Sequence, residues 1–151
     1  MGRLWYFAQA VLGILFRHPV LGTSVIPVLA DGRIVLVRRR DCGKWGLPGG
    51  MVQWGEDVHT TAKRELAEET GLELIKVLRL VGVYSSPERD PRIHSICIAL
   101  EAEVRGDLHI NDRYELSDIK AFELSAIPFG NLAHDHEQQL KDYLQNLTVL
   151  A

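Results

Sequence analysis

Residues 57–70 constrain the fold of this chain more than any other segment. Val58, Ala62 and Leu66 recur at helical spacing and form one apolar face. Gly71 follows directly, where a glycine commonly ends a helix. The segment therefore predicts an amphipathic helix that ends at a left-handed glycine.

The glutamates of this segment border the apolar face, whereas solvated charges usually lie opposite it. On a helical wheel Glu65 lies about 40° from Glu69 and about 60° from Glu68. Clustered carboxylates repel one another, and oxygen ligands favour Mg²⁺ or Mn²⁺ over Zn²⁺. Such a cation neutralises phosphate oxygens and lowers the pKa of an attacking water. The alternative is a solvated acidic face whose charge Lys63 and Arg64 balance.

A longer motif around these glutamates favours the metal interpretation. The pattern G-x5-E-x7-R-E-U-x-E-E-x-G-U, with U a bulky apolar residue, is matched without a departure by Gly50, Glu56, Arg64, Glu65, Leu66, Glu68, Glu69, Gly71 and Leu72. This is the Nudix box, so the chain resembles the Nudix hydrolase family there. The order of predicted strands and helices is also similar to that family over about residues 22–147.

The resemblance implies the fold, the reaction and the cofactor. The expected fold is α/β, a Nudix-type α/β/α sandwich with a mixed sheet. The expected activity is hydrolysis of a pyrophosphate bond that depends on Mg²⁺ or Mn²⁺. By this likeness Glu65, Glu68 and Glu69 are the metal ligands, and any one of them could assist as the base.

A charged pair within the motif is expected to hold the loop that precedes the helix. By the same likeness Glu56 and Arg64 lock that loop onto the helix, which would fix the approach of the Gly49 and Gly50 backbone to the phosphates. An ordinary surface ion pair between Glu56 and Arg64 is the alternative.

Further site residues are expected outside the motif. Such enzymes often use a fourth carboxylate, for which Glu115 is our first choice and Glu101 the alternative. Arg38, Arg39 and Arg40 end the second predicted strand. One of them, for which we take Arg38, could reach a phosphate, while alternation along the strand turns at least one toward solvent.

The segment 85–94 bears on the substrate, because its sequence SSPERDPRIH is similar to a loop in ADP-ribose pyrophosphatase-like Nudix proteins. Arg89 or Arg92 could pair with a phosphate, and Tyr84 could stack on a base. A Pro-rich turn with exposed charges is the alternative for the loop. ADP-ribose or a similar nucleoside diphosphate sugar is the predicted substrate.

Two other functions are open. The first is MutT-like hydrolysis of oxidised nucleoside triphosphates. The second is a nucleotide-binding sensor without catalysis, which is disfavoured because every carboxylate of the motif is present. A covalent intermediate is not expected, since the histidines are scattered and His134 and His136 lie far from the motif in sequence.

The remaining elements follow from hydrophobic patterns and turn residues. Strands are predicted at 23–30, 33–37, 74–84, 93–104 and 119–124, and a closing helix at 133–147. Asp31-Gly32 predicts a hairpin turn, and the segment Leu47 to Gly50 another turn. Pro27 predicts an edge position or a bulge in the first strand.

The N-terminal segment is apolar but short. Residues 4–16 are nearly all apolar, whereas a bilayer-spanning helix needs about 20 such residues. We expect residues 1–21 to form a packing or dimerisation helix and residues 22–151 to form the hydrolase domain. A membrane-surface anchor is the alternative.

Charge and cysteine content narrow the class of partner. The net charge of −3, from 17 basic and 20 acidic residues, argues against a nucleic-acid partner. It allows a small nucleotide, which needs only local positive charge or a metal. Cys42 and Cys97 are too few for a disulfide scaffold, so a cytoplasmic location is expected. A homodimer is possible, and a membrane partner is not expected.

Overall fold

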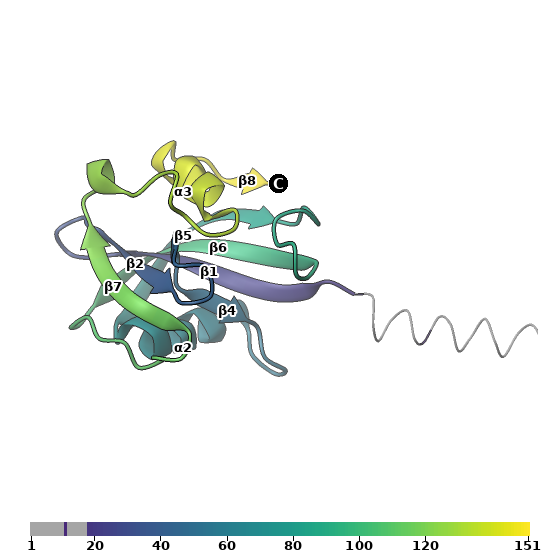
Figure 1. Cartoon of the computed structure of the whole chain (residues 1–151), viewed down its shortest axis with the longest axis horizontal. Helices are drawn as coiled ribbons and strands as arrows, with labels where there is room; N and C mark the ends of the chain where they lie inside the picture. Colours follow the sequence, from purple (N-terminus) through teal and green to yellow (C-terminus); the bar gives the residue numbers. More distant parts are fainter. Residues whose placement is uncertain (1–10, 12–17) are drawn as a thin grey trace, which may run out of the picture.

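The computed structural model describes residue 11 and residues 18–151. These residues form one 8-stranded mixed sheet in the order β3-β2-β1-β6-β5-β8, with β4 beside β1 and β7 beside β2 (Figure 1). The elements are β1 (Val20–Val28), β2 (Ile34–Arg39), β3 (Trp45–Gly46), β4 (Gly49–Met51), α2 (Val58–Thr70), β5 (Glu73–Tyr84), β6 (Ser95–Arg105), β7 (Leu116–Phe122), η1 (Leu124–Ala126), α3 (His136–Leu144) and β8 (Val149–Leu150).

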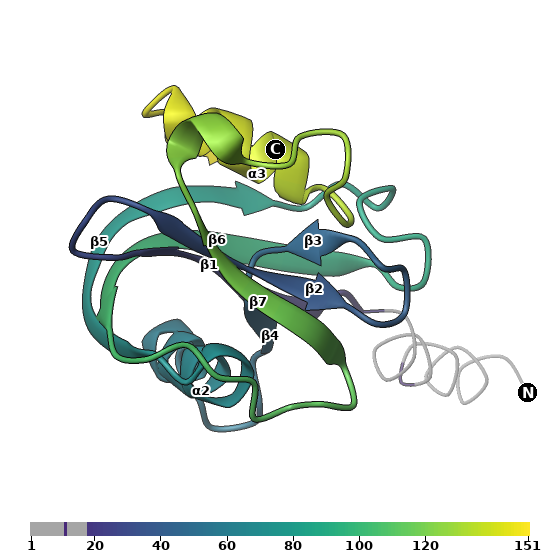
Figure 2. The same cartoon turned by 60° about the vertical axis from the view of Figure 1, so that its left-hand side comes forward.

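The two helices α2 and α3 cover opposite faces of the sheet (Figure 2). Neighbouring residues of β1 show this directly, because successive side chains of a strand point to opposite faces. Val25 packs in the cluster that contains Leu66 of α2, whereas Ile26 packs in the cluster that contains Leu140 of α3. The predicted α/β/α sandwich with a mixed sheet is confirmed.

Helix α2 begins and ends as its sequence predicts. The Asp57 side chain accepts a hydrogen bond from the Thr60 N–H at 2.7 Å, which satisfies one of the free donors at the helix start. Gly71 ends the helix in the left-handed conformation at φ 73°, and its N–H donates to Ala67 O. The apolar face of α2 packs on the sheet, so the neighbouring glutamates lie at the rim of the core.

The edge position predicted for Pro27 was wrong, because β1 is a central strand between β2 and β6. Val25 and Leu29 donate their N–H groups to Pro48 and Arg33, on the β2 and β4 side of the strand. Pro27 faces that same side, where β1 pairs with β2 only at Val28 and Ile34. The proline therefore lies in a local gap of the ladder and removes no sheet hydrogen bond there.

Several element boundaries differ from the prediction. The predicted turn at Leu47 to Gly50 overlaps the short strand β4 (Gly49–Met51), which pairs with β1. The closing helix spans only His136–Leu144 instead of 133–147. The two-residue strands β3 and β8 were not predicted, and the other strands agree with the prediction to within a few residues.

The N-terminal prediction falls mostly on residues 1–10 and 12–17, which lie outside the described residues. Its final part differs from the structure, because β1 begins at Val20 and pairs there with Ser95 of β6. No helix within residues 18–151 has the length and apolar character needed to cross a bilayer.

Candidate functional site

Gly49 and Gly50, the first two residues of β4, allow the backbone to pass close to both β1 and α2. A Cβ on Gly49 would overlap the carbonyl oxygen of Thr23, and a Cβ on Gly50 would overlap the carboxylate of Glu65. No other residue type fits these contacts without movement of the neighbouring groups. This close approach places the Gly49 N–H directly beside Glu69 of α2.

Glu69 is the most deeply placed of these glutamates, with only 7% of its surface exposed. Its Oε2 accepts a hydrogen bond from the Gly49 N–H at 2.8 Å. Burial raises the pKa of Glu69 to about 8, because the ionised form loses hydration and gains little compensation from that single donor. A nearby cation would remove this cost.

Arg64 joins the loop before α2 to the glutamate cluster. Its Nε and Nη2 donate to the two carboxylate oxygens of Glu56 at 2.8 and 2.9 Å, which is the predicted pair in bidentate form. Its Nη2 also donates to Met51 O at 3.2 Å, and its Nη1 to Glu65 at 2.7 Å. The Arg64 hydrogen bonds hold the pKa of Glu56 down to about 2, so this carboxylate stays ionised.

The glutamates face a cleft of about 560 Å³. The cleft is lined by Arg39, Gly49, Gly50, Met51, Gln53, Glu65, Glu68, Glu69, Arg92, Ile93, Asp112 and Glu115. We call it the acidic cleft. Glu115, from the loop before β7, lines the acidic cleft together with the glutamates of α2.

The structure separates the two candidates for a fourth carboxylate. Glu115 lies in the acidic cleft and raises the pKa of both Glu65 and Glu69 by charge repulsion, after the larger effect of their burial. Glu101 instead pairs with Arg79 at 2.7 Å and lines a cavity with Tyr143 of α3, on the other face of the sheet. Glu115 is the candidate that this geometry supports.

The arginine at the end of β2 that lines the cleft is Arg39, so the choice of Arg38 needs correction. Arg38 is exposed, and its Nε donates to Gly43 O at 2.9 Å. Because side chains alternate along a strand, Arg39 points to the other side, where it forms two hydrogen bonds with Asp41 at 3.0 and 2.7 Å. Arg39 is the strand residue that could reach a bound phosphate.

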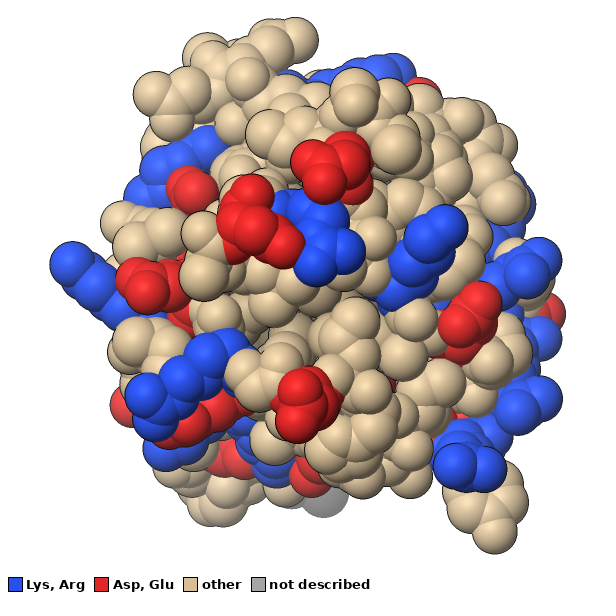
Figure 3. Space-filling model, turned by 90° about the vertical axis from the view of Figure 1, so that its left-hand side faces the viewer, with Lys and Arg blue, Asp and Glu red and all other residues tan. Residues whose placement is uncertain are grey.

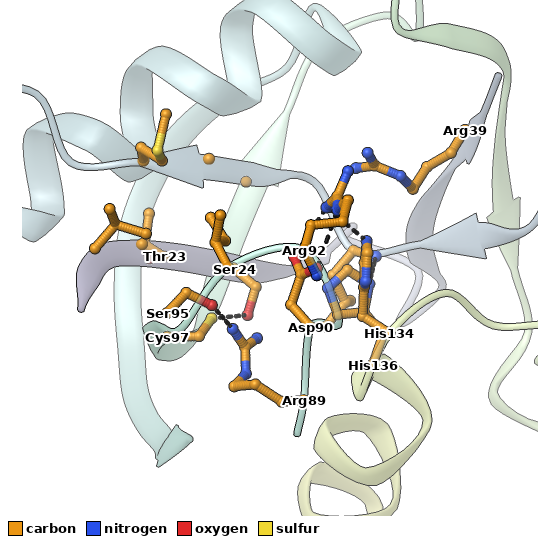
Figure 4. Close-up of a pocket in the computed structure, with 17 residues that line it drawn as sticks. Thr23, Ser24, Arg39, Arg89, Asp90, Arg92, Ser95, Cys97, His134 and His136 are labelled. Atoms are coloured by element: carbon orange, nitrogen blue, oxygen red, sulfur yellow. Dashed lines mark hydrogen bonds and ion pairs between the residues drawn. The ribbon is translucent and has the colours of Figure 1, made fainter. Parts of the chain in front are cut away.

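A second, smaller pocket of about 160 Å³ adjoins the acidic cleft (Figure 4). We call it the inner pocket. The two cavities share the Gly49–Gly50 edge and the side chains of Arg39 and Arg92. Arg92 is held by Asp90, whose carboxylate accepts from the Arg92 Nε at 3.0 Å and Nη2 at 2.9 Å. The Asp-Pro-Arg sequence thus folds back on itself and places Arg92 at the junction of the two cavities.

Arg89 and Tyr84 do not fit the roles predicted for them. Arg89 lines the inner pocket, but its side chain is only 9% exposed. Its Nε and Nη2 donate to Asp135 at 2.9 Å and its Nη1 donates to Ser95, so all three of its nitrogens already have partners. Tyr84 is only 3% exposed, and its hydroxyl donates to Asp142 at 2.8 Å. Tyr84 belongs to the core beneath α3 and offers no free ring face for a base.

The surface carries charges of both signs. On the face in Figure 3, basic and acidic side chains are interspersed, and neither sign forms a continuous area. The expected absence of a nucleic-acid partner stays a prediction.

The carboxylates of the acidic cleft suit a hard divalent cation in their chemistry. All are oxygen donors, which Mg²⁺ and Mn²⁺ prefer, and the buried Glu69 needs positive charge nearby. Within residues 18–151, no three acidic, histidine or cysteine side chains already form a metal-binding group. The contacts above explain this, because Arg64 holds Glu65 and the Gly49 N–H holds Glu69.

We expect Gly50→Ala to lower the hydrolysis rate by at least about a hundredfold while the protein stays folded. The added methyl group would meet the Glu65 side chain and displace its carboxylate from the cleft. Steady-state kinetics and thermal unfolding of the variant check this. Activity close to that of the unmodified protein would show that Glu65 is not needed where the structure places it.

Comparisons with known proteins agree with this geometry. A family model described as NUDIX domain matches residues 18–147. An ADP-ribose pyrophosphatase from Methanocaldococcus jannaschii is 41% identical over 135 residues, which cover 87% of this chain and 76% of that protein.

Solved structures show the same fold. A MutT NUDIX hydrolase from Burkholderia pseudomallei superimposes with a TM-score of 0.74 at 28% identity, over 83% of this chain and 98% of the other. The NUDIX domain of Shewanella oneidensis NrtR, complexed with ADP ribose, has a TM-score of 0.76 at 24% identity, over 97% of this chain and 99% of the other.

Proposed function

The chain belongs to the Nudix family and is a Nudix pyrophosphohydrolase, and from that premise we propose that it hydrolyses the pyrophosphate bond of ADP-ribose or a similar nucleoside diphosphate sugar. We further propose that Mg²⁺ or Mn²⁺, held by Glu65, Glu68 and Glu69, is required. The relative with 41% identity is named as an ADP-ribose pyrophosphatase, which supports this substrate class.

The arrangement of the two cavities is the observation that carries the substrate proposal. The acidic cleft and the inner pocket meet at the Gly49–Gly50 edge, with Arg39 and Arg92 at the junction. A molecule with a diphosphate between two organic groups suits this shape, because the diphosphate can lie at the junction and each organic group can extend into one cavity. Arginine is the residue best suited to bind phosphate oxygens in pairs.

A divalent cation in the acidic cleft would neutralise phosphate charge and lower the pKa of the attacking water. The residues of the chain position the groups around that reaction. Arg64 orients Glu65, and the Gly49 N–H orients Glu69. Arg39 and Arg92 would bind the phosphate oxygens, and Glu115 faces the α2 glutamates, where it could accept a proton from water.

Direct attack by water fits the composition of the acidic cleft. Among the described residues that line it, none is Ser, Thr, Cys, Lys or His. A covalent intermediate on such a side chain therefore has no residue to form on in this cleft. Attack by water on one phosphorus of ADP-ribose would yield AMP and ribose 5-phosphate.

A nucleotide panel tests the substrate proposal. The purified protein is incubated with Mg²⁺ or Mn²⁺ and with ADP-ribose, other nucleoside diphosphate sugars, and ordinary and oxidised nucleoside triphosphates. We expect the highest kcat/KM for ADP-ribose or another nucleoside diphosphate sugar, with a nucleoside monophosphate as product. A higher kcat/KM for an oxidised nucleoside triphosphate would favour the MutT-like alternative instead. The cytoplasmic location and a homodimer stay predictions.

A further inference from the structure

We propose that His136 is a positioning residue for the hydrolytic site, where it fixes the turn that presents the Gly49 N–H to Glu69. This inference rests on the proposed function, because it assigns a role within the site of that reaction. His136 is the first residue of α3, far from the glutamates in sequence and on the other face of the sheet. Figure 4 shows it beside His134 at the wall of the inner pocket.

The contact that carries the inference is one hydrogen bond to the backbone. The Leu47 N–H donates to Nδ1 of His136 at 3.0 Å, and both residues are buried, with 4% and 9% of their surfaces exposed. The ring lies close against β3, since a Cβ on Gly46 would come within 2.8 Å of the same nitrogen. Removal of the ring would leave the buried Leu47 N–H without its acceptor, which costs free energy.

The protonation state of the ring agrees with this contact. Burial lowers the pKa of His136 to about 3, so the ring is neutral near pH 7. A neutral imidazole has one donor and one acceptor nitrogen. Because Nδ1 accepts from Leu47, the proton must lie on Nε2.

The side chain of His136 continues a backbone pairing that α3 interrupts. Trp45 donates to Asn131 O at 3.1 Å, and Ala133 donates to Trp45 O at 2.7 Å, so the segment before α3 runs beside β3. At His136 the backbone has turned into the helix, and its N–H donates to Ala133 O. The next donor is the Leu47 N–H, directly after β3. Its hydrogen bond goes to the imidazole instead of to a backbone carbonyl.

The hydrogen bond of His136 is the first of three that hold consecutive residues of the turn. Leu47 is held by His136, the carbonyl of Pro48 accepts from the Val25 N–H at 2.9 Å, and Gly49 donates to Glu69 at 2.8 Å. Leu47 is only two residues from Gly49, and a proline restricts the backbone between them. A shift at Leu47 would therefore move the Gly49 N–H relative to the Glu69 carboxylate.

Three substitutions in the full-length protein separate this role from simple packing. Asn places its amide oxygen near the position of Nδ1, so His136→Asn retains an acceptor for Leu47. His136→Leu fills space without an acceptor, and His136→Gln carries its oxygen near the position of Nε2. We expect His136→Leu and His136→Gln to lower kcat with ADP-ribose by about ten- to a hundredfold, and His136→Asn to stay within about threefold of the unmodified protein.

Two further measurements do not depend on hydrolysis. Amide hydrogen exchange followed by NMR should become faster at Leu47 and Gly49 in His136→Leu but not in His136→Asn. Mn²⁺ titration followed by electron paramagnetic resonance should show weaker binding in His136→Leu. On a Glu69→Gln background, His136→Leu should lower Mn²⁺ affinity little further, because the charged carboxylate through which His136 acts is already absent.

The outcomes distinguish the two proposals. Equal kcat values for the Leu and Asn variants, or unchanged amide exchange at Leu47 and Gly49, would overturn the positioning role even if ADP-ribose is the substrate. A proton on Nδ1 of His136 in the unmodified protein, detected by ¹⁵N chemical shifts at pH 7, would also overturn it. A failure of the unmodified protein to cleave ADP-ribose would overturn the proposed substrate, while the exchange data would still decide the role of His136.

Discussion

We expect chelation of divalent metal with EDTA to abolish the hydrolysis of ADP-ribose, and added Mg²⁺ or Mn²⁺ to restore it. This is the expected result because the acidic cleft gathers four glutamates, three from α2 and Glu115 from the facing loop, around the place where a diphosphate would bind. Without a cation, the negative charges of the carboxylates and of the substrate repel each other. Product release is measured before chelation, after chelation and after metal is added back.

The control for this experiment must show that the protein stays folded when the metal is chelated. Circular dichroism before and after EDTA should superimpose, because the two hydrophobic clusters of the core contain none of the proposed metal ligands. Full activity in metal-free buffer would contradict the assignment of the acidic cleft as a metal site.

Glu69→Gln has the second-largest expected effect, a loss of at least about a thousandfold in kcat. The amide keeps the size of the side chain and can still accept from the Gly49 N–H, but it lacks the charge that binds a cation. Glu103→Gln is the matched control, since Glu103 is exposed on β6 and lies outside the acidic cleft. A loss of only a few-fold in Glu69→Gln would show that Glu69 is not a metal ligand.

The same variant should not lose stability in metal-free buffer. The pKa of Glu69 is raised from its ordinary value of 4.5 to about 8 in the folded state, so the folded state binds the proton more tightly than the unfolded state. Protonated Glu69 therefore stabilises the folded state at low pH, and this contribution is lost as the pH rises from about 4.5 to about 8. At pH 8 and above, the Glu69→Gln variant should unfold at a temperature no lower than that of the unmodified protein.

The parts of the fold that local sequence determines were predicted well. Helix α2 follows from its apolar spacing and from Gly71, and the glutamates follow from an unbroken motif. The pair of Glu56 and Arg64 was also predictable, because both partners lie within that motif and close along the chain. These features depend on residues that are close together in the sequence, so they can be predicted without knowing how the strands pair.

The residues that were missed depend on how distant segments meet. Alternation along β2 shows that neighbouring arginines face different sides, but it cannot say which side holds the site, so Arg38 was chosen instead of Arg39. His136 reaches Leu47 only because residues 131–133 run beside β3. The sequence of the strand does not show that α3 covers Tyr84, whose hydroxyl donates to Asp142, so base stacking was predicted for it.

Hydrolysis of ADP-ribose in ¹⁸O-labelled water tests the central claim most directly. If a water attacks one phosphorus in the acidic cleft, the products are AMP and ribose 5-phosphate, and mass spectrometry finds one label in a single product phosphate and none in the protein. A single-turnover reaction in which the label enters an enzyme carboxylate would contradict this mechanism. Release of free ribose together with intact ADP would contradict it as well, because the broken bond would then be glycosidic and not a pyrophosphate bond.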